Sequence, residues 1–310
     1  MEKGYSVRAL HRGQHLPFFI ASDIIDKVEW VTGNVLDPSS LGDAMGSIDV
    51  VIHAAAKVSF NGREKKELFK TNIDGTANMV NIALENNVKR FVYISSVAAI
   101  GRNNNGELVS EQTKWEEGKL NTFYAVSKYH AEMEVWRGMG EGLDVVVLNP
   151  GTIIGYGDWN TSSCAIFKNT YKEFPWYTTG INGFVSVGDV ARATVLLMES
   201  NFSGERFIVN GDNWSFHQLL NSIADGFGKK RPGREASPFL GEIAWRIEKI
   251  KSILSGKKPL LTNQTARIAQ SKTHFDNHKI LNALPGFSFT PLEQAIEEAC
   301  KQYLKKLQPL

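Results

Sequence analysis

The first half of the chain alternates short apolar runs with longer helix-forming stretches. The apolar runs are rich in β-branched and aromatic residues, as strands buried in a sheet usually are. They lie at residues 5–10, 28–33, 49–56, 91–96 and 144–150. Residues 72–84 are amphipathic, and residues 129–136 are rich in helix formers. Strands that alternate with helices predict an α/β fold with a doubly wound parallel sheet.

The second half follows a different pattern. Residues 184–200 have helical spacing, residues 206–210 read as one more strand, and the chain from residue 215 onward is mostly helical. Residues 156–183 show little regular pattern but carry many aromatic side chains, among them Trp159, Phe167, Tyr171, Phe174, Trp176 and Tyr177. We therefore expect a smaller, mostly helical second domain.

The chain around residues 239–254 is amphipathic, with lysines at 249 and 251 and, just after it, at 257 and 258. Such a helix could lie on a membrane surface. We favour a helix that covers the core of the second domain, because the apolar face of an amphipathic helix usually packs inside its own protein.

Composition excludes several classes of protein. A net charge of +2 gives no reason to expect nucleic acid or an acidic membrane as partner. No apolar run approaches the roughly 20 residues of a membrane span. Cys164 and Cys300 make no disulfide framework, so a reduced, cytoplasmic setting is expected, and Cys164 reads as a small buried residue. His274 and His278 have helical spacing but no third ligand candidate, so we predict no metal site.

Three side chains suggest chemistry. Ser96 ends an apolar strand, and Tyr124 and Lys128 follow at i and i+4 of an expected helix. A lysine cation one turn away favours the phenolate, and a serine hydroxyl can hold a carbonyl oxygen as negative charge develops on it. The group therefore predicts carbonyl reduction or its reverse, with hydride supplied from elsewhere. The alternative is that Ser96 caps a helix and the tyrosine–lysine spacing is accidental.

The order of several motifs resembles the extended short-chain dehydrogenase/reductase family, also called the NAD-dependent epimerase/dehydratase family. The resemblance covers nearly the whole chain. Among the branches of the family, the chain is most similar to the dihydroflavonol-reductase-like branch. It implies a Rossmann-like fold. The motifs are His53-Ala54-Ala55-Ala56, Asn72-Ile73-Asp74-Gly75-Thr76, Ser95-Ser96, Tyr124-x-x-x-Lys128, Asn149-Pro150-Gly151, residues 184–191 and Phe275-Asp276-Asn277.

The resemblance implies a role for each matching residue. Tyr124 would be the general acid/base, Lys128 would tune it and hold the nicotinamide ribose, and Ser96 would bind the carbonyl. Further cofactor contacts are expected along the same edge, from Ala54, Ala55, Asn72, Pro150 and Ile153. Residues 1–155 and 184–213 would form the dinucleotide-binding domain, and residues 156–183 and 214–310 the substrate domain.

Cofactor preference is read from the end of the first visible strand. Members that prefer NAD usually carry an acid there, whereas this chain has Leu10-His11-Arg12. Arg12 could pair with a 2′-phosphate, so NADP is favoured over NAD. Asn34 and Val35 match the segment beside the adenine, with Asn34 in place of the usual aspartate.

One departure from the family is large. Its members begin with a strand and a glycine-rich turn that brings backbone N–H groups to the pyrophosphate, and neither is in this sequence. The missing strand would lie between the strands at residues 5–10 and 49–56. We expect a mis-set start codon or a truncated gene, and weak cofactor binding by the chain as printed.

The substrate is indicated only by class. Val97 and Ala98 stand where family dehydratases usually carry an acid pair. The aromatic residues from Trp159 to Tyr177, here called the aromatic insert, favour an apolar or aromatic ketone or aldehyde as substrate over a sugar nucleotide. The alternative is that these rings only pack the second domain. Two alternative functions stay open: a nucleotide-sugar epimerase and a non-catalytic binding or regulatory protein. The chain could also form a homodimer.

Overall fold

The computed structural model describes residues 3–13, 16–17, 19–101, 108–118, 121–255, 259 and 261–307. A parallel four-stranded sheet with strand order β3-β4-β5-β9 lies at its centre. Its strands are β3 (Val50–His53), β4 (Arg90–Ile94), β5 (Val145–Pro150) and β9 (Glu205–Val209). The sheet confirms the predicted doubly wound α/β class.

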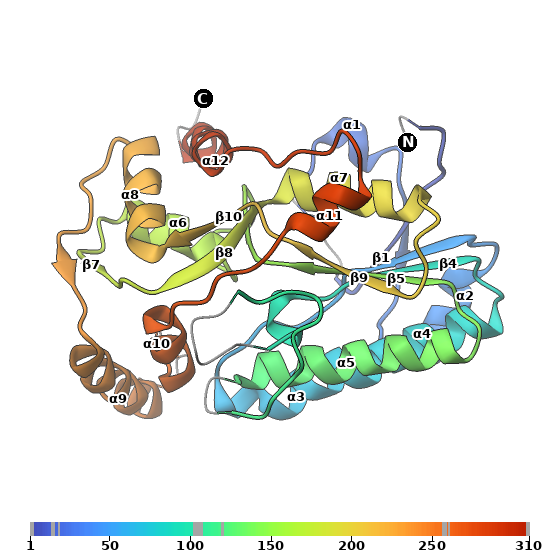
Figure 1. Cartoon of the computed structure of the whole chain (residues 1–310), viewed down its shortest axis with the longest axis horizontal. Coiled ribbons are helices and arrows are strands. Elements are labelled where there is room, and N and C mark those ends of the chain that lie inside the picture. Colours follow the sequence, from blue (N-terminus) through green and yellow to red (C-terminus); the bar gives the residue numbers. More distant parts are fainter. Residues whose placement is uncertain are drawn as a thin grey trace.

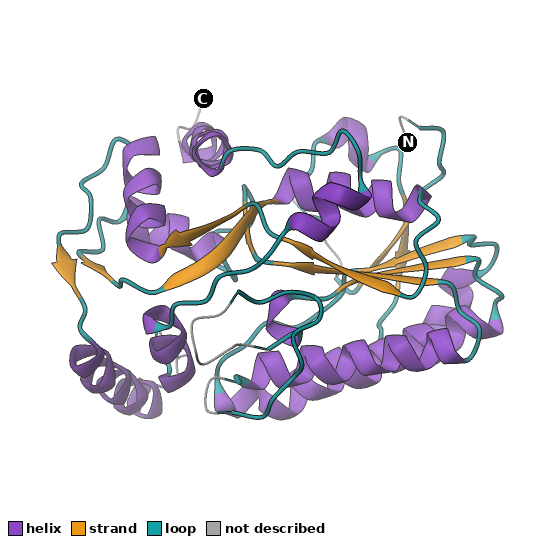
Figure 2. Cartoon of the chain, in the orientation of Figure 1, coloured by secondary structure: helices purple, strands orange, loops and turns teal. Residues whose placement is uncertain are grey.

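Helices cover both faces of this sheet (Figures 1 and 2). On one face α2 (Pro38–Met45), α4 (Gly75–Glu85) and α5 (Phe123–Gly140) pack over a core that includes Val80, Phe91 and Val135. On the other face α7 (Val187–Glu199) and α11 (His278–Ala283) pack over Val146 and Phe207. The strands of the central sheet are thus buried between two layers, as their continuous apolar sequences predict.

Strands β1 (Arg8–His11) and β2 (Glu29–Thr32) form a separate parallel pair, with α1 (Ser22–Ile25) between them in sequence. Within the described residues, β1 makes no strand pairing with β3. The sheet is therefore divided at the position where the sequence predicts that a strand is missing. Gly4 has a φ of +84°, as a helix-capping glycine would, but Met1 and Glu2 of the predicted helix end lie outside the described residues.

A second group of elements surrounds a smaller sheet with strand order β10-β8-β6. Its strands are β6 (Thr152–Ile154), β8 (Ile181–Ser186) and β10 (Asp212–Ser215). Helices α6 (Cys164–Tyr171), α8 (Phe216–Gly226) and α12 (Leu292–Leu307) enclose an aromatic core with it. The short strands β7 (Trp176–Tyr177) and β11 (Arg234–Glu235) pair beside α9 (Pro238–Ser255) and α10 (Asn263–Gln270).

Two predictions for this part of the chain are wrong. Residues 156–183 are not irregular, since they hold α6, β7 and the start of β8. Residues 184–186 belong to strand β8 and not to a helix, and α7 begins at Val187. The Ser186 side chain accepts a hydrogen bond from the Gly188 N–H and so fixes the start of the helix there.

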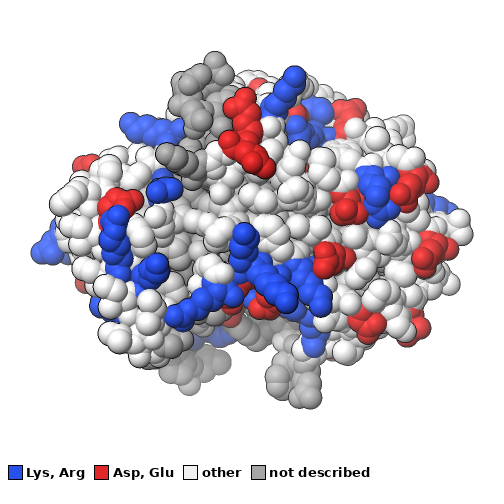
Figure 3. All heavy atoms as spheres, turned by 90° about the horizontal axis from the view of Figure 1, so that it is seen from below, with Lys and Arg blue, Asp and Glu red and all other residues white. Residues whose placement is uncertain are grey.

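The helix predicted over residues 239–254 is present as α9, but it does not cover a core. Ser252 is its only buried residue, and most of its large apolar side chains face outward. Figure 3 views the molecule from the side of α5 and α9, where basic groups gather near the middle of the face. Every helix of the described chain is too short or too polar to cross a bilayer.

Candidate active site

The three predicted catalytic residues meet at the carboxyl edge of the central sheet. Strands β3, β4 and β5 run parallel, so the segments that follow them lie side by side. Ser96 follows β4, and Tyr124 lies in the first turn of α5, where the Thr122 hydroxyl accepts a hydrogen bond from the Ala125 N–H at 3.0 Å. The cap fixes where the helix begins, and therefore where the phenol points.

Ser96 has two partners. Its hydroxyl oxygen accepts a hydrogen bond from the Ala98 N–H at 3.2 Å and caps a short helix over Val97–Ala99. The same hydroxyl lies near the Tyr124 side chain, close enough to lower the pKa of the phenol. Ser96 thus caps a helix, as the structural alternative predicts, and it also lies beside the Tyr124 phenol, as the catalytic interpretation requires.

The Tyr124 phenol is half-buried, and the Phe60 ring approaches it edge-on at 6.0 Å between centroids. Burial raises the pKa of Tyr124 above its usual value, and the nearby Ser96 hydroxyl offsets part of that rise. The sequence predicts the opposite direction, on the assumption that Lys128 favours the phenolate. That prediction is wrong for the structure described here, because the protein around the phenol disfavours its charged form.

Lys128 lies in the interior, with 1 % of its surface exposed. Its Nζ donates to the Tyr93 hydroxyl at 2.8 Å and to the Ile94 carbonyl at 2.9 Å, and it lies 4.3 Å from the Tyr93 ring centroid. Burial lowers the pKa of Lys128 to about 7, although the negative charge of Glu132 acts in the other direction. The amine therefore changes charge near neutral pH.

Asn72 joins two segments of the site. Its side-chain amide exchanges hydrogen bonds with the Lys57 backbone, at 2.7 Å to the N–H and 2.9 Å to the carbonyl. It also donates to the Ser127 hydroxyl at 2.9 Å, and that hydroxyl donates to the Tyr124 carbonyl at 2.8 Å. Asn72 lies in a π-helical turn (Lys70–Asp74), so it is not a helix cap. It fixes the loop after β3 against the start of α5.

Glu132 was not predicted from the sequence. Its side chain, 1 % exposed, lies one helical turn beyond Lys128. One carboxylate oxygen accepts from the Ser95 hydroxyl at 2.6 Å and the Asn149 amide at 2.9 Å. The other accepts from Arg206 and Trp136, both at 3.3 Å. The only signal in the sequence is its i+4 spacing from Lys128, which places both on one helix face.

The predicted adenosine-side residues lie around β1 and β2. Arg12 is exposed directly after β1. The Asn34 side-chain oxygen accepts from the Leu36 N–H at 3.0 Å, so this oxygen already has a partner within its own turn. Val35 is buried against Gly75, where a Cβ atom would lie 2.7 Å from the Val35 Cγ2 atom. The glycine thus allows α4 to approach the segment after β2 closely.

The predicted nicotinamide-side residues surround the same edge. Ala54 and Ala55 are exposed after β3, Pro150 ends β5 and is buried, and Ile153 is half-buried in β6. Small exposed side chains leave the backbone accessible to a flat ring. This part of the chain fits a nicotinamide, whereas the described residues contain no glycine-rich turn for the pyrophosphate.

The aromatic insert mostly packs the second core. Trp159 lies 5.6 Å and Phe167 5.3 Å from the Tyr303 ring centroid, and Tyr171 lies 5.2 Å from that of Phe227. These three rings therefore do not support the predicted substrate pocket. Phe174 is exposed at the surface.

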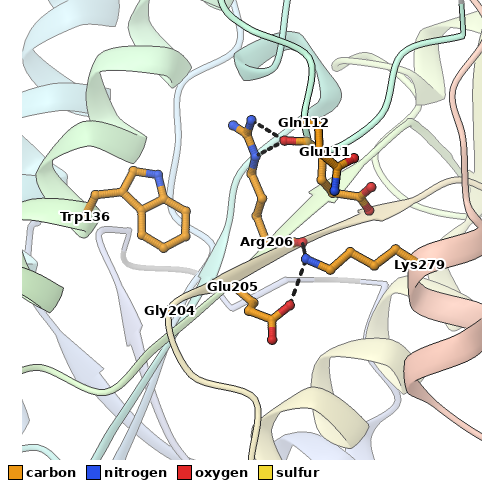
Figure 4. Close-up of a pocket in the computed structure, with 7 residues that line it drawn as sticks. All are labelled: Glu111, Gln112, Trp136, Gly204, Glu205, Arg206 and Lys279. Atoms are coloured by element: carbon orange, nitrogen blue, oxygen red, sulfur yellow. Dashed lines mark hydrogen bonds and ion pairs between the residues drawn. The ribbon is translucent and has the colours of Figure 1, made fainter.

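A pocket of about 410 Å³ lies beside β9, where Trp136 and Arg206 face Glu111 and Lys279 (Figure 4). The Arg206 guanidinium donates to the Glu111 carbonyl, and Lys279 pairs with Glu205 at 2.8 Å. The pocket is separate from Ser96 and Tyr124, but Arg206 links its wall to Glu132. Because these charged groups already have protein partners, we assign the pocket no ligand.

Residues 1–210 match the family model described as the NAD dependent epimerase/dehydratase family. The chain belongs to this family. It is therefore an enzyme of the extended short-chain dehydrogenase/reductase type, and its relatives use a nicotinamide cofactor.

Among curated relatives, the chain is 30 % identical over 307 residues to a putative dihydroflavonol 4-reductase of Synechocystis sp., covering 96 % of this chain and 88 % of the relative. It is 31 % identical to sterol demethylase protein B of Methylococcus capsulatus, covering 76 % of this chain and 74 % of the relative. It is 30 % identical to cinnamoyl-CoA reductase 1 of Petunia hybrida, covering 67 % of this chain and 66 % of the relative.

Among solved structures, gox2253 superposes with a TM-score of 0.81 at 27 % identity, covering 98 % of this chain and 92 % of that one. The UDP-glucose 4-epimerase of Thermotoga maritima gives a TM-score of 0.78 at 19 % identity, covering 99 % and 93 %. The second likeness shows the fold alone.

Proposed function

We propose that the chain reduces the carbonyl group of a small apolar or aromatic ketone or aldehyde, using NADPH. The cofactor supplies the hydride. Tyr124 gives its proton to the carbonyl oxygen, while the Ser96 hydroxyl donates a hydrogen bond to that oxygen. The observation that carries the proposal is that the Ser96 hydroxyl lies close enough to the Tyr124 phenol to lower its pKa, at the carboxyl edge of the sheet beside the exposed Ala54 and Ala55.

With a raised pKa, Tyr124 carries its proton at neutral pH, as a proton donor must, although burial makes it a weaker acid than an ordinary phenol. A phenol whose pKa lies above its usual value keeps its proton at neutral pH and can donate it as negative charge develops on the substrate. Lys128, with a pKa of about 7, can take up a proton near the same pH. Glu132 keeps the charged form of Lys128 accessible by its own negative charge.

The substrate class is supported by three observations. The relatives named above include a putative dihydroflavonol 4-reductase and a cinnamoyl-CoA reductase. Val97 and Ala98 give the site no acid next to Ser96. The Phe60 ring lies against Tyr124, so an apolar surface borders the phenol. We also propose that residues 1–155 and 184–213 hold the cofactor and that residues 156–183 and 214–310 hold the substrate.

The preference for NADPH rests on Arg12. Its exposed guanidinium follows β1, where it can form a bidentate contact with a 2′-phosphate. Replacing it, R12S, should weaken NADPH binding about tenfold or more and change NADH binding less than about twofold. Fluorescence titration of both cofactors measures this, and NADH is the internal control. Equal losses for the two cofactors would contradict the proposal.

The function is tested by following NADPH oxidation with a panel of aromatic aldehydes, ketones and UDP-sugars. Both the printed chain and a version extended through any in-frame upstream codons are assayed, because the glycine-rich turn is not in the printed sequence. Reduction of an aromatic carbonyl supports the proposal. Interconversion of UDP-sugars without net oxidation of NADPH would identify an epimerase. Cofactor binding with no turnover of any panel member would favour a non-catalytic protein.

A further inference from the structure

Helix α9 carries seven large apolar side chains that are between 41 and 83 % exposed. They are Phe239, Leu240, Ile243, Ile247, Ile250, Ile253 and Leu254. The opposite side of the helix packs on α10 and buries Ser252. In Figure 3 the left part of the face, where α9 lies in Figure 1, is white apart from scattered charged groups, most of them blue. An apolar stripe of this size on a protein surface marks a site of interaction.

Although the net charge of the whole chain gives no reason to expect such a partner, we propose that this outer face, the α9 stripe, docks on the surface of an anionic lipid bilayer. The helix has three cations, Arg246, Lys249 and Lys251, against two acids, for a net charge of +1. Its Arg246 and Lys251 side chains are 57 and 68 % exposed. Apolar residues bordered by exposed cations are the pattern of helices that lie in a membrane interface.

The two acids are turned toward the protein more than the cations are. Glu242, 40 % exposed, pairs with Arg246 at 2.8 Å, and Glu248, 20 % exposed, pairs with Lys251 at 3.2 Å. An approaching surface therefore meets cations first, and anionic headgroups complement them. Lys257 and Lys258 follow in the sequence and lie outside the described residues.

A second copy of the chain fits this face less well. Leu240, Ile243, Ile247, Ile250 and Leu254 recur at intervals of three and four, as in a coiled-coil seam. In a parallel pair, Arg246 of one helix would face Lys251 of the other. In an antiparallel pair centred on Ile247, the two Arg246 side chains would lie next to each other on the same edge of the interface. Both arrangements bring like charges together.

The area also argues against a dimer through this helix alone. An 18-residue helix is about 27 Å long and about 10 Å wide, which is a footprint of roughly 300 Å². A stable protein interface buries about 800 Å² on each partner. A bilayer has no such requirement, because apolar side chains partition individually into the boundary between headgroups and acyl chains.

Docking is tested with the printed chain by sedimentation with vesicles of phosphatidylcholine containing phosphatidylglycerol at about 30 %, against vesicles of phosphatidylcholine alone. We expect binding to the anionic vesicles that falls several-fold when NaCl rises from about 0.1 to 0.5 M. The double variant I247D/I250D should bind at least tenfold more weakly. These side chains are 48 and 59 % exposed, so the variant should fold, which circular dichroism checks. F174D is the matched control, because Phe174 is 58 % exposed outside α9.

Three results would overturn the proposal. One is no sedimentation of the parent chain with anionic vesicles, and another is equal binding by parent and I247D/I250D. The third is a concentration-dependent dimer in sedimentation velocity that I247D/I250D dissolves, since it would assign the α9 stripe to a second copy of the chain. None of these readouts uses enzyme activity, so the docking proposal stands or falls separately from the proposed reduction.

Discussion

The ammonium nitrogen of Lys128 donates a hydrogen bond to the hydroxyl of Tyr93 at 2.8 Å, deep in the layer between the central sheet and α5. The lysine side chain is enclosed by β4 on one side and its own helix on the other, with the Ile94 carbonyl as its second acceptor. Burial of this kind disfavours the charged amine, whichever role the residue has in catalysis. Lys128 should therefore lower the stability of the folded chain at neutral pH.

The first prediction concerns the loss of stability that the burial of Lys128 causes. The pKa of Lys128 is about 7 in the folded chain and 10.5 for an ordinary lysine. Between these values the unfolded chain binds more protons, so the free energy of unfolding should rise with pH. K128M should remove that rise and be more stable than the parent at pH 7, by about 1.4 kcal/mol for each pKa unit that the parent loses to burial. Urea unfolding between pH 6.5 and 9.5 measures both effects.

K89M is the control for this comparison. Lys89 is an exposed lysine that pairs with Asp49 at 2.7 Å, and exposed ion pairs contribute little to stability because water screens them. Its replacement should leave the pH dependence unchanged. A K128M variant that is less stable than the parent at pH 7, or that keeps the same pH dependence, would show that the lysine is accommodated without an electrostatic penalty.

The second prediction concerns Glu132. In E132Q the neutral amide keeps the shape of the side chain but loses the charge that Ser95, Asn149 and Arg206 contact. We expect a loss of about 3 kcal/mol in the free energy of unfolding. We also expect the pKa of Lys128 to fall below about 7, since Glu132 raises it. The part of the kcat/KM pH profile that reflects the ionisation of Lys128 should then move to lower pH.

E134Q is the matched control, in the same helix and two residues away. Glu134 is 30 % exposed and pairs with Arg137 on the surface at 2.9 Å. Its loss should cost about 0.5 kcal/mol and leave the pH profile in place. An E132Q enzyme with reduced stability but an unshifted pH profile would make Glu132 a structural residue that does not influence Lys128.

Much of the fold and the site is visible in the sequence, because both depend on patterns that are local in the chain. The apolar run before Ser96 and the spacing of Tyr124 and Lys128 are read directly from the sequence. Burial is not local. The shift in the pKa of Lys128 depends on Tyr93 and Glu132 being packed around it, and the raised pKa of Tyr124 has the same origin.

The errors in the second half have related causes. Helix α6 is only eight residues long and lies within a run of aromatics that pack on α8 and α12, so its helical spacing spans little more than two turns. The helical spacing of residues 184–200 continues through the end of β8, and only the cap at Ser186 marks the boundary. The outward direction of the apolar face of α9 could not be foreseen, because a helical pattern shows which residues share a face and not what that face meets.

The third prediction compares two glycines. At Gly75 a Cβ atom would lie 2.7 Å from the Val35 Cγ2 atom and 3.2 Å from its Cβ atom. G75A should therefore push Val35 out of its packed position and cost about 1–3 kcal/mol. At Gly42, inside α2, a Cβ atom meets nothing within 4 Å. G42A should stabilise the chain by about 0.5–1 kcal/mol, through better helix propensity.

Thermal and urea unfolding of both variants test this pair. Since Val35 lies on the adenosine side of the predicted cofactor site, G75A should also weaken NADPH binding, and G42A should not. Equal stability of G75A and the parent would mean that α4 can shift away from Val35 without loss. A destabilised G42A would indicate that α2 needs the glycine for a contact that the structure does not show.

The last prediction concerns Tyr124. In Y124F the ring that lies against Phe60 is kept and only the proton donor is lost. General acid catalysis contributes about 10²- to 10⁴-fold, so carbonyl reduction should fall by that factor while the Kd for NADPH changes less than about threefold. Because burial raises the pKa of Tyr124, its proton is retained at neutral pH, and the parent should show no loss of reduction from ionisation of this phenol between pH 6 and 9. The reverse oxidation needs the phenolate and should become faster as the pH rises toward 10. Stopped-flow measurement of hydride transfer in both directions tests these expectations. A Y124F enzyme that still reduces carbonyls at the parent rate would show that Tyr124 is not the proton donor.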